Sequence, residues 1–429
     1  MTTSLTRAGR PLRCLMVGYN GTGNTGSDIR LLTAIDDVRE AFGPQTQVTV
    51  MTIDRERTAA ILPVGAGIEV AEVSFSPVRF TFSIWNLARR HDVMLLVEGS
   101  TFKQNWSVWL LHAYLWAANC ARWTGNHAIA YAVDVGELRG FHGFRARYEC
   151  ERMALVITRT EIARQRLQEL GVRRPILSNT DTAFRYLREG QPRVAGRRVV
   201  GLAPIEFFHW PVCIKLWCDP AERYRWPYAF TWNAERRAQS DAMLQRWVNL
   251  ARHAIEQHDV DIQLIAMEDL DTPVCERILE ELGPLATNRV AIASSRQVSP
   301  GDMVSMLRGL DGLVTSRYHA CVLSMGGAVP QMAISHDERL ASIYAEMGIE
   351  QELLLHYLQP DLADQLLIKF DLLMQTSPEL TQRIREQHDN RFLPLCAQNR
   401  FDLQAWGQRT FDSIGAASNP ELKHTLKSD

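Results

Sequence analysis

The first 190 residues alternate short apolar or β-branched runs with longer stretches in which apolar residues recur every three or four positions. The short runs predict strands, and the periodic stretches predict amphipathic helices. The clearest helix is predicted over 28–42, where Ile29, Leu32, Ile35 and Val38 share one face. This alternation is typical of a parallel sheet with helices on both faces. The predicted strands are 12–17, 48–53, 68–73, 93–97, 128–133 and 155–158.

The alternation restarts after a polar segment at 188–198, which contains Gly and Pro and predicts a domain boundary. We therefore expect Rossmann-like domains over 1–190 and 191–375, followed by a helical tail over 376–429. An aromatic and proline-rich insertion at 204–232 fits neither period. It is either an ordered lid or cleft wall, or a packed surface insertion. The strands predicted in the second domain are 199–202, 262–267, 290–293, 312–315 and 329–334.

Charge and composition exclude several classes of protein. The net charge is −2, from 47 basic and 49 acidic residues, so we expect no nucleic-acid partner. The polar N-terminus lacks the apolar core of a signal peptide. The most apolar stretch, 108–123, contains His112, Asn119 and Arg122 and predicts a buried helix, not a membrane span. The eight cysteines form no CxxC pair, so we expect no metal site, no disulfide framework and a cytoplasmic location.

A glycine-rich loop over 18–28 follows the first predicted strand and precedes the first predicted helix. Its four glycines allow backbone N–H groups to approach a ligand at the positive end of a helix, as an anion or a sugar hydroxyl requires. The spacing matches neither a dinucleotide fingerprint nor a P-loop. The alternative is a tight turn with Asp28 as helix N-cap. The predicted ligand-contacting residues are Asn20, Gly21, Thr22, Gly23 and Asn24.

Two further segments lie at the carboxyl ends of predicted strands, where open α/β sheets bind ligands. In the segment 97–101, Glu98 is a candidate general base or acceptor for hydroxyl groups, and Ser100 a candidate ligand-binding residue. In the segment 131–137, Asp134 is a candidate base. The alternatives are a Ser or Thr cap on the next helix for the first segment and a buried turn aspartate for the second.

The strongest candidate is the segment 315–320, between a predicted strand and an apolar helix. Arg317 offers a planar fork of donors for a carboxylate or phosphate. His319 lies about where the helix begins, and the helix dipole there disfavours the imidazolium form. A neutral histidine that accepts and returns a proton is therefore expected. The alternative is an ordinary surface turn.

These segments have the order and spacing of motifs in the polysaccharide pyruvyl transferase family, which the chain resembles over residues 12–375. The glycine loop and the Arg-x-His pair at Arg317 and His319 match the family's motifs. Val97 and Glu98 replace two glycines of a Gly-Gly-Gly-Ser turn, and 132–134 departs from a Gly-Gln-Gly-like strand end. We therefore expect a divergent member with an open acceptor class. The other matching segments are 119–125, those around Arg159 and Asp181, and 327–339.

The resemblance implies a GT-B-like fold, with two doubly wound Rossmann-like domains facing across a cleft that holds the active site. It implies an acceptor-side first domain, a donor-side second domain, and phosphoenolpyruvate as donor with no further cofactor. A pyruvyl group would pass to a hydroxyl of a sugar, glycan or other small acceptor. Carried over, Arg317 binds the donor and His319 handles the proton, with Tyr318 and Arg339 in the same donor-side motifs.

Two alternatives stay open at this point. A GT-B glycosyltransferase with a nucleotide-sugar donor would use an acidic residue to bind the ribose, and Asp337 or Glu338 fits that role. A non-catalytic family member would bind a ligand and tolerate replacement of Arg317 and His319. The acceptor, the pathway and the oligomeric state are left open by the sequence.

Overall fold

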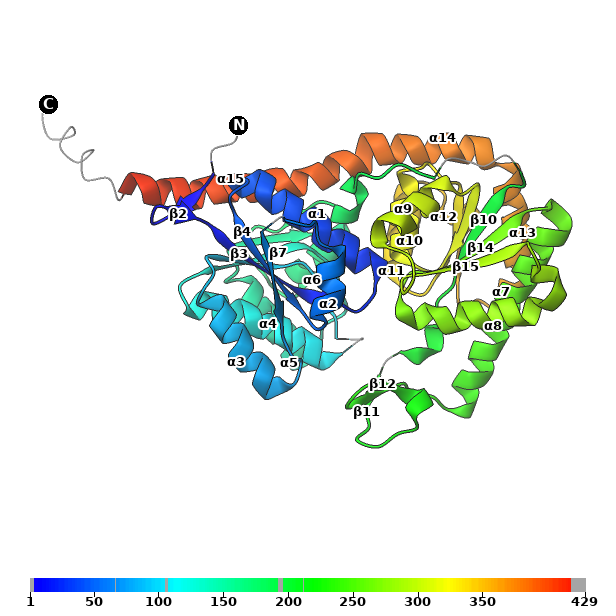
Figure 1. Cartoon of the computed structure of the whole chain (residues 1–429), viewed down its shortest axis with the longest axis horizontal. Helices are drawn as coiled ribbons and strands as arrows, with labels where there is room; N and C mark the ends of the chain where they lie inside the picture. Colours follow the sequence, from blue (N-terminus) through cyan, green and yellow to red (C-terminus); the bar gives the residue numbers. More distant parts are fainter. Residues whose placement is uncertain (1–3, 66, 105–106, 192–195, 211, 418–429) are drawn as a thin grey trace, which may run out of the picture. The chain divides into compact units, whose positions relative to one another are not determined.

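The computed structural model describes residues 4–65, 67–104, 107–191, 196–210 and 212–417. The chain forms two units, each built around its own parallel sheet (Figure 1). Unit 1 comprises Met1–Thr22, Arg30–Arg185 and Pro394–Asp429, and unit 2 comprises Gly23–Ile29 and Tyr186–Leu393.

The sheet of unit 1 has the strand order β5-β4-β3-β6-β7-β8-β9, and all its pairs are parallel. The chain adds strands on one side of β3 and then returns to the other side with β6, so the switch point lies between β3 and β6. Every strand predicted for this half is present. The bounds are β3 Arg13–Asn20, β4 Gln47–Thr52, β5 Ile68–Glu72, β6 Val93–Leu96, β7 His127–Val133, β8 Leu155–Thr158 and β9 Leu177–Ser178.

Both faces of this sheet are buried, because successive side chains of a strand point to opposite faces. In β3, Leu15 and Val17 belong to one apolar cluster, and Cys14 and Met16 belong to the other. The predicted buried helix is confirmed as α4, and no helix of the described ranges is long and apolar enough to cross a membrane. The helices that lie wholly or mostly in unit 1 are α1 Thr25–Phe42, α2 Arg55–Ile61, α3 Pro77–Ala88, α4 Val108–Trp123, α5 Gly140–Cys150, α6 Glu161–Glu169 and α15 Leu393–Ala417.

The sheet of unit 2 has the order β15-β14-β10-β16-β17-β18, again with all pairs parallel. Its switch point lies between β10 and β16, where Ala203 pairs with Thr315. Both sheets are therefore doubly wound, as predicted. The sequence analysis did not find β18. The bounds are β10 Val199–Ala203, β14 Asp261–Ala266, β15 Val290–Ser294, β16 Gly312–Thr315, β17 Gln331–Ser335 and β18 Leu354–His356.

The insertion at 204–232 forms a small antiparallel sheet with the order β11-β13-β12 (Figure 1). Its strands are Cys213–Ile214, Arg223–Arg225 and Tyr228–Ala229 for β11, β12 and β13, which are too short to show a period in the sequence. The helices of unit 2 are α7 Ala234–His258, α8 Thr272–Leu282, α9 Pro300–Gly309, α10 Tyr318–Met325, α11 Glu338–Glu346, α12 Glu350–Leu353, α13 Leu362–Gln375 and α14 Ser377–Gln387.

The unit bounds differ from the predicted domains in two places. Residues 23–29, inside the predicted first domain, belong to unit 2. The predicted tail at 376–429 is divided, because unit 2 extends to Leu393 and unit 1 resumes at Pro394. Helix α14, a π-helical turn at His388–Phe392 and α15 follow one another without a loop, so no polar linker marks this boundary.

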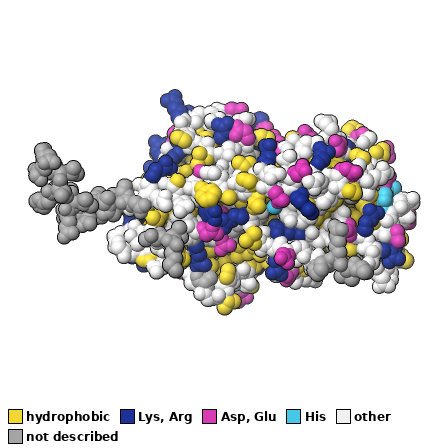
Figure 2. Space-filling view, turned by 90° about the horizontal axis from the view of Figure 1, so that it is seen from above, with side chains coloured by type: hydrophobic (Ala, Val, Ile, Leu, Met, Phe, Trp, Pro, Cys, Tyr) yellow, Lys and Arg dark blue, Asp and Glu magenta, His cyan; other side chains and the backbone are white. Residues whose placement is uncertain are grey.

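Charged side chains of both signs are interspersed over the face shown in Figure 2. This agrees with a net charge of −2 from nearly equal numbers of basic and acidic residues. A local cluster of basic side chains, and not a positive potential over the whole surface, must therefore hold any anionic ligand.

Candidate functional site

The polar side chains of unit 2 gather at the carboxyl edge of its sheet. Strands β10, β14, β16 and β17 all end there, because they are parallel neighbours. Ligands of doubly wound sheets bind at this edge, next to the switch point between β10 and β16. The loops and first helical turns that follow these four strands contain His209, Glu268, Asp271, Arg317, His319, Asp337 and Arg339.

Arg317 lies between two carboxylates. Its Nε donates to Oδ2 of Asp271 at 2.7 Å, its Nη1 donates to Oε2 of Glu268 at 3.0 Å, and its Nη2 also pairs with Asp271. The side chains of Arg317 and Asp271 are 12% and 1% exposed. Burial raises the pKa of Asp271 to about 7, although the guanidinium acts in the opposite direction. Burial also disfavours the Arg317 cation, but the two carboxylates outweigh it and raise its pKa, so Arg317 stays charged.

Within unit 2, the second half of the glycine loop lies on the segment that follows β14. Asn24 donates from Nδ2 to Oε2 of Glu268 at 2.9 Å, and the Thr25 N–H donates to the Met267 carbonyl at 2.9 Å. Asn24 also accepts from the Ser27 N–H through Oδ1 at 3.2 Å, as a helix cap does. Asp28 lies inside the first turn of α1, so Asp28 is not the helix N-cap of the alternative interpretation.

His319, the second residue of α10, lies directly on Gly26 of this loop. A Cβ at Gly26 would lie 2.0 Å from Nδ1 and 2.6 Å from Cβ of His319. The glycine is therefore required by the close approach of the imidazole. The structure thus brings together the glycine loop and the Arg-x-His pair, which the sequence analysis treated as separate candidates.

Gly26→Ala is expected to destabilise unit 2 by about 1–3 kcal/mol, because the added methyl group overlaps both the ring and the Cβ of His319. Equilibrium denaturation followed by circular dichroism measures the change. Gly196→Ala is the matched control, because a Cβ there meets nothing within 4 Å, and it should change stability by less than about 0.5 kcal/mol. Equal effects of the two substitutions would contradict the observed contact.

The insertion brings a second histidine to this edge. His209 stacks on Phe230, with ring centroids 3.9 Å apart and an interplanar angle of 11°, and meets Trp232 edge-on. Burial lowers the pKa of His209 to about 4, and the positive charge of Arg317 adds to that effect. His209 is therefore neutral near pH 7. The sequence analysis missed this residue, because a histidine in a loop of irregular pattern gives no signal.

Tyr318 and Arg339 lie in the same part of unit 2. The Arg339 guanidinium lies over the Tyr318 ring at 5.4 Å, and its Nε donates to Oδ2 of Asp337 at 2.6 Å. Asp337 also caps α11 by accepting from the Arg339 N–H. The carboxylate of Asp337, a candidate ribose-binding residue, thus forms an ion pair with Arg339.

The remaining candidates of the glycine loop, of which Gly23 belongs to unit 2 and the others to unit 1, have local roles in the backbone. Asn20 is buried and donates from Nδ2 to the Met51 carbonyl at 2.8 Å. Gly21 and Gly23 have φ angles of +82° and +71°, which favour glycine. The Thr22 hydroxyl donates to the Tyr19 carbonyl at 3.4 Å. These contacts account for the residue types of this half of the loop by backbone geometry.

Glu98 follows β6 and accepts hydrogen bonds from nearby backbone. Its Oε2 accepts from the Tyr19 N–H at 3.3 Å, and its Oε1 accepts from the N–H and the hydroxyl of Ser100 at 3.3 and 3.2 Å. The carboxylate therefore joins the end of β3 to the turn after β6. This arrangement favours a structural role for the Glu98 and Ser100 pair.

Asp134 belongs to a buried ion-pair network of unit 1. Lys103 Nζ lies 2.8 Å and Arg159 Nη2 lies 3.2 Å from Oδ2 of Asp134. Arg159 also pairs with Asp181 at 2.7 Å, so two segments that match family motifs contact each other. Arg30 lies 3.6 Å from the same Asp181. The carboxylate of Asp134 is thus held by two cations, and this network favours a structural role for Asp134 as well.

Solved structures with a similar fold include a putative UDP-N-acetylglucosamine 2-epimerase from Listeria monocytogenes. It has a TM-score of 0.61 and 12% identity and covers 94% of this chain and 97% of its own. A glycosyltransferase from Rickettsia africae has a TM-score of 0.56 and 10% identity, with coverages of 93% and 98%. A UDP-GlcNAc 2-epimerase from Neisseria meningitidis has a TM-score of 0.53 and 9% identity, with coverages of 94% and 100%. These likenesses and the two Rossmann-like units give the chain a GT-B-like fold, as predicted.

A search of curated proteins finds no match to this sequence. The family model described as polysaccharide pyruvyl transferase matches residues 41–338, which is more than half of the chain. The chain belongs to the polysaccharide pyruvyl transferase family.

Proposed function

We propose that this protein transfers a pyruvyl group from phosphoenolpyruvate to hydroxyl groups of a sugar or glycan, with release of phosphate. Membership of the family supports the class of reaction. The observation that carries the assignment to a site is the placement of Arg317 and His319 at the switch point of unit 2, where α10 begins.

The reaction needs one proton on carbon 3 of phosphoenolpyruvate and two new bonds at carbon 2. An acceptor hydroxyl oxygen bonds to carbon 2 as carbon 3 gains its proton. A second hydroxyl oxygen then displaces phosphate, which leaves with the electron pair of its bond to carbon 2. Of the two protons lost by the hydroxyls, one balances the proton on carbon 3 and the other leaves with phosphate or solvent. In this proposal, His319 takes and returns the proton.

The helix start suits a group that cycles between two protonation states. The positive end of α10 disfavours a permanent imidazolium at His319. The same positive end favours the phosphate or carboxylate of the donor nearby.

Arg317 has a more limited part in this proposal than a free arginine would have. Three of its nitrogen atoms donate to the carboxylates of Asp271 and Glu268, which leaves at most two of its five N–H groups for the donor. We propose that Arg317 mainly positions the start of α10, and that the donor anion meets its remaining N–H groups.

Isothermal titration with phosphoenolpyruvate, UDP and UDP-GlcNAc tests the proposal. We expect saturable binding of phosphoenolpyruvate and none of the two nucleotides. Asp271→Asn keeps the shape of the side chain. At pH 8, where a carboxyl group with a pKa of about 7 is mostly ionised, it removes one negative charge beside Arg317 and should tighten phosphoenolpyruvate binding severalfold. Binding of UDP-GlcNAc in place of phosphoenolpyruvate would overturn the proposal in favour of a nucleotide-sugar enzyme. Unchanged affinity in a folded Asp271→Asn variant would remove Arg317 from the donor site.

A further inference from the structure

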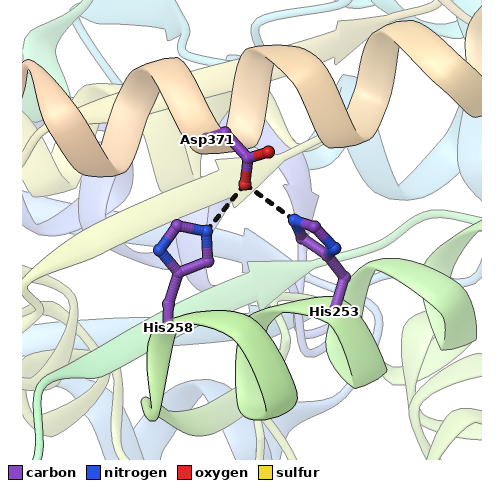
Figure 3. A group of neighbouring side chains, drawn as sticks. All are labelled: His253, His258 and Asp371. Carbon is purple, nitrogen blue, oxygen red and sulfur yellow. Dashed lines mark hydrogen bonds and ion pairs between the residues drawn. The ribbon is translucent and has the colours of Figure 1, made fainter.

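Two histidines and an aspartate meet in unit 2 on helices that the proposed reaction does not use. His253 and His258 lie in the last turns of α7, and Asp371 lies on α13. The Nε2 atoms of both histidines lie 2.7 Å from the same carboxylate oxygen, Oδ1 of Asp371 (Figure 3). Figure 3 shows both imidazoles turned from α7 toward the carboxylate on the facing helix.

We propose that His253, His258 and Asp371 bind a divalent transition-metal ion, with Zn²⁺ as the best match to the ligands. Their three ligand atoms lie within 4.8 Å of one another. Imidazole nitrogen and carboxylate oxygen are ordinary zinc ligands, with bonds of about 2.0–2.2 Å, and three protein ligands leave a fourth position for water. A bound ion replaces the hydrogen bonds, because it takes the lone pairs of Nε2 and releases or relocates the protons there.

The surroundings favour a cation at this place. His258 is the last residue of α7, and the carbonyl groups at the end of a helix give it a partial negative charge. The Phe370 ring packs edge-on against both imidazoles, at 6.3 and 5.4 Å between centroids, and restricts their orientation. The three side chains are 17–38% exposed, which gives an ion and a water molecule access from solvent.

The neighbouring carboxylate is not available as a further ligand. Asp259 follows His258 and pairs with Arg197 and Arg289, each at 2.9 Å. Among the described residues, one group of three His, Cys, Asp or Glu side chains has its ligand atoms this close together. It consists of His253, His258 and Asp371. The expectation of no metal site rested on the cysteine pattern, which does not involve these residues.

The position in the fold indicates a structural role for the ion. β14 begins at Asp261, three residues after His258, so the cluster lies at the amino edge of the sheet. Arg317 and His319 follow β16 at the carboxyl edge. A metal at the cluster would join α7 to α13, and its presence does not depend on the reaction proposed for the other edge.

Zinc titration of the metal-free full-length protein tests this site by calorimetry, together with metal analysis after dialysis. We expect one Zn²⁺ per chain, a raised melting temperature with zinc, and no comparable response to Mg²⁺, which prefers oxygen ligands. Co²⁺ in place of Zn²⁺ should give the visible absorption of a low-coordinate site. His258→Gln and Asp371→Asn should each weaken binding by more than about 100-fold, beyond the loss typical of outer-shell changes.

The matched control is His142→Gln. His142 and His112 form another histidine pair, with Nδ1 and Nε2 at 3.0 Å, in unit 1. This control should keep wild-type zinc binding. Circular dichroism establishes that each variant is folded. Absence of saturable zinc binding in the wild type, or equal binding in His258→Gln and His142→Gln, would overturn the proposal.

Discussion

Arg317→Ala is expected to lower the free energy of unfolding by about 3–5 kcal/mol, the cost typical of removing one partner from a buried ion pair. The substitution leaves Asp271, whose side chain is 1% exposed, and Glu268 without the guanidinium that holds them. Urea denaturation followed by circular dichroism measures the loss.

Arg296→Ala is the matched control for this prediction. Arg296 belongs to the same unit, is 55% exposed and lies 3.7 Å from Asp269, so its removal should cost less than about 0.5 kcal/mol. A cost for Arg317→Ala no larger than that for Arg296→Ala would show that the ion pairs contribute nothing.

This expectation changes how a binding result must be interpreted. Loss of phosphoenolpyruvate binding in Arg317→Ala is ambiguous, because the variant loses both a donor contact and the support for α10. Asp271→Asn is the informative variant, since it alters the charge beside Arg317 and leaves the guanidinium in place. The unfolding measurements therefore test whether Arg317 positions α10, and the binding measurements on Asp271→Asn test whether Arg317 contacts the donor.

His319→Gln is expected to reduce the rate of phosphate release from phosphoenolpyruvate, in the presence of glycan acceptors, by ~10²–10⁴-fold. Glutamine keeps hydrogen-bonding capacity but does not take up a proton near neutral pH. Phosphoenolpyruvate affinity should stay within about threefold of wild type, because the proposed role is in turnover. The rates come from a phosphate assay and the affinities from calorimetry.

His356→Gln is the control for this prediction, because His356 is an exposed histidine of the same unit. It should keep both the wild-type rate and the wild-type affinity. A pH profile adds a further criterion: a limb of the wild-type profile that reports a histidine should be absent from the residual activity of His319→Gln. Wild-type rates in a folded His319→Gln variant would contradict the catalytic role of His319.

The sequence by itself determined the fold class and most of its strands, because hydrophobic periodicity is local information. It missed β18, which is three residues long, β9, which is two residues long, and the strands of the insertion, which have two or three residues. Its tail boundary at residue 376 differs from the unit boundary at Pro394, because the helical run from α14 through α15 has no linker to signal a change of unit.

The sequence also suggested Arg317 and His319 as site residues, because their spacing after a predicted strand is a local pattern. The ion-pair partners of Arg317 could not be predicted from the sequence, since Asp271 and Glu268 lie 46 and 49 positions away along the chain. Gly26 was noted only as one glycine of the glycine-rich loop, and the contact with His319 gives the reason for that glycine.

Tertiary structure alone decided which charged side chains form ion pairs and which residues lie together at one edge of a sheet. Asp134 had the sequence context of a base, but two cations hold its carboxylate in the folded chain. His253, His258 and Asp371 had no motif at all, because two of them sit on one helix and the third arrives 113 residues later. Periodicity specifies which face of an element is buried, whereas ion pairs and ligand clusters depend on side chains that only the packing of distant elements brings within bonding distance.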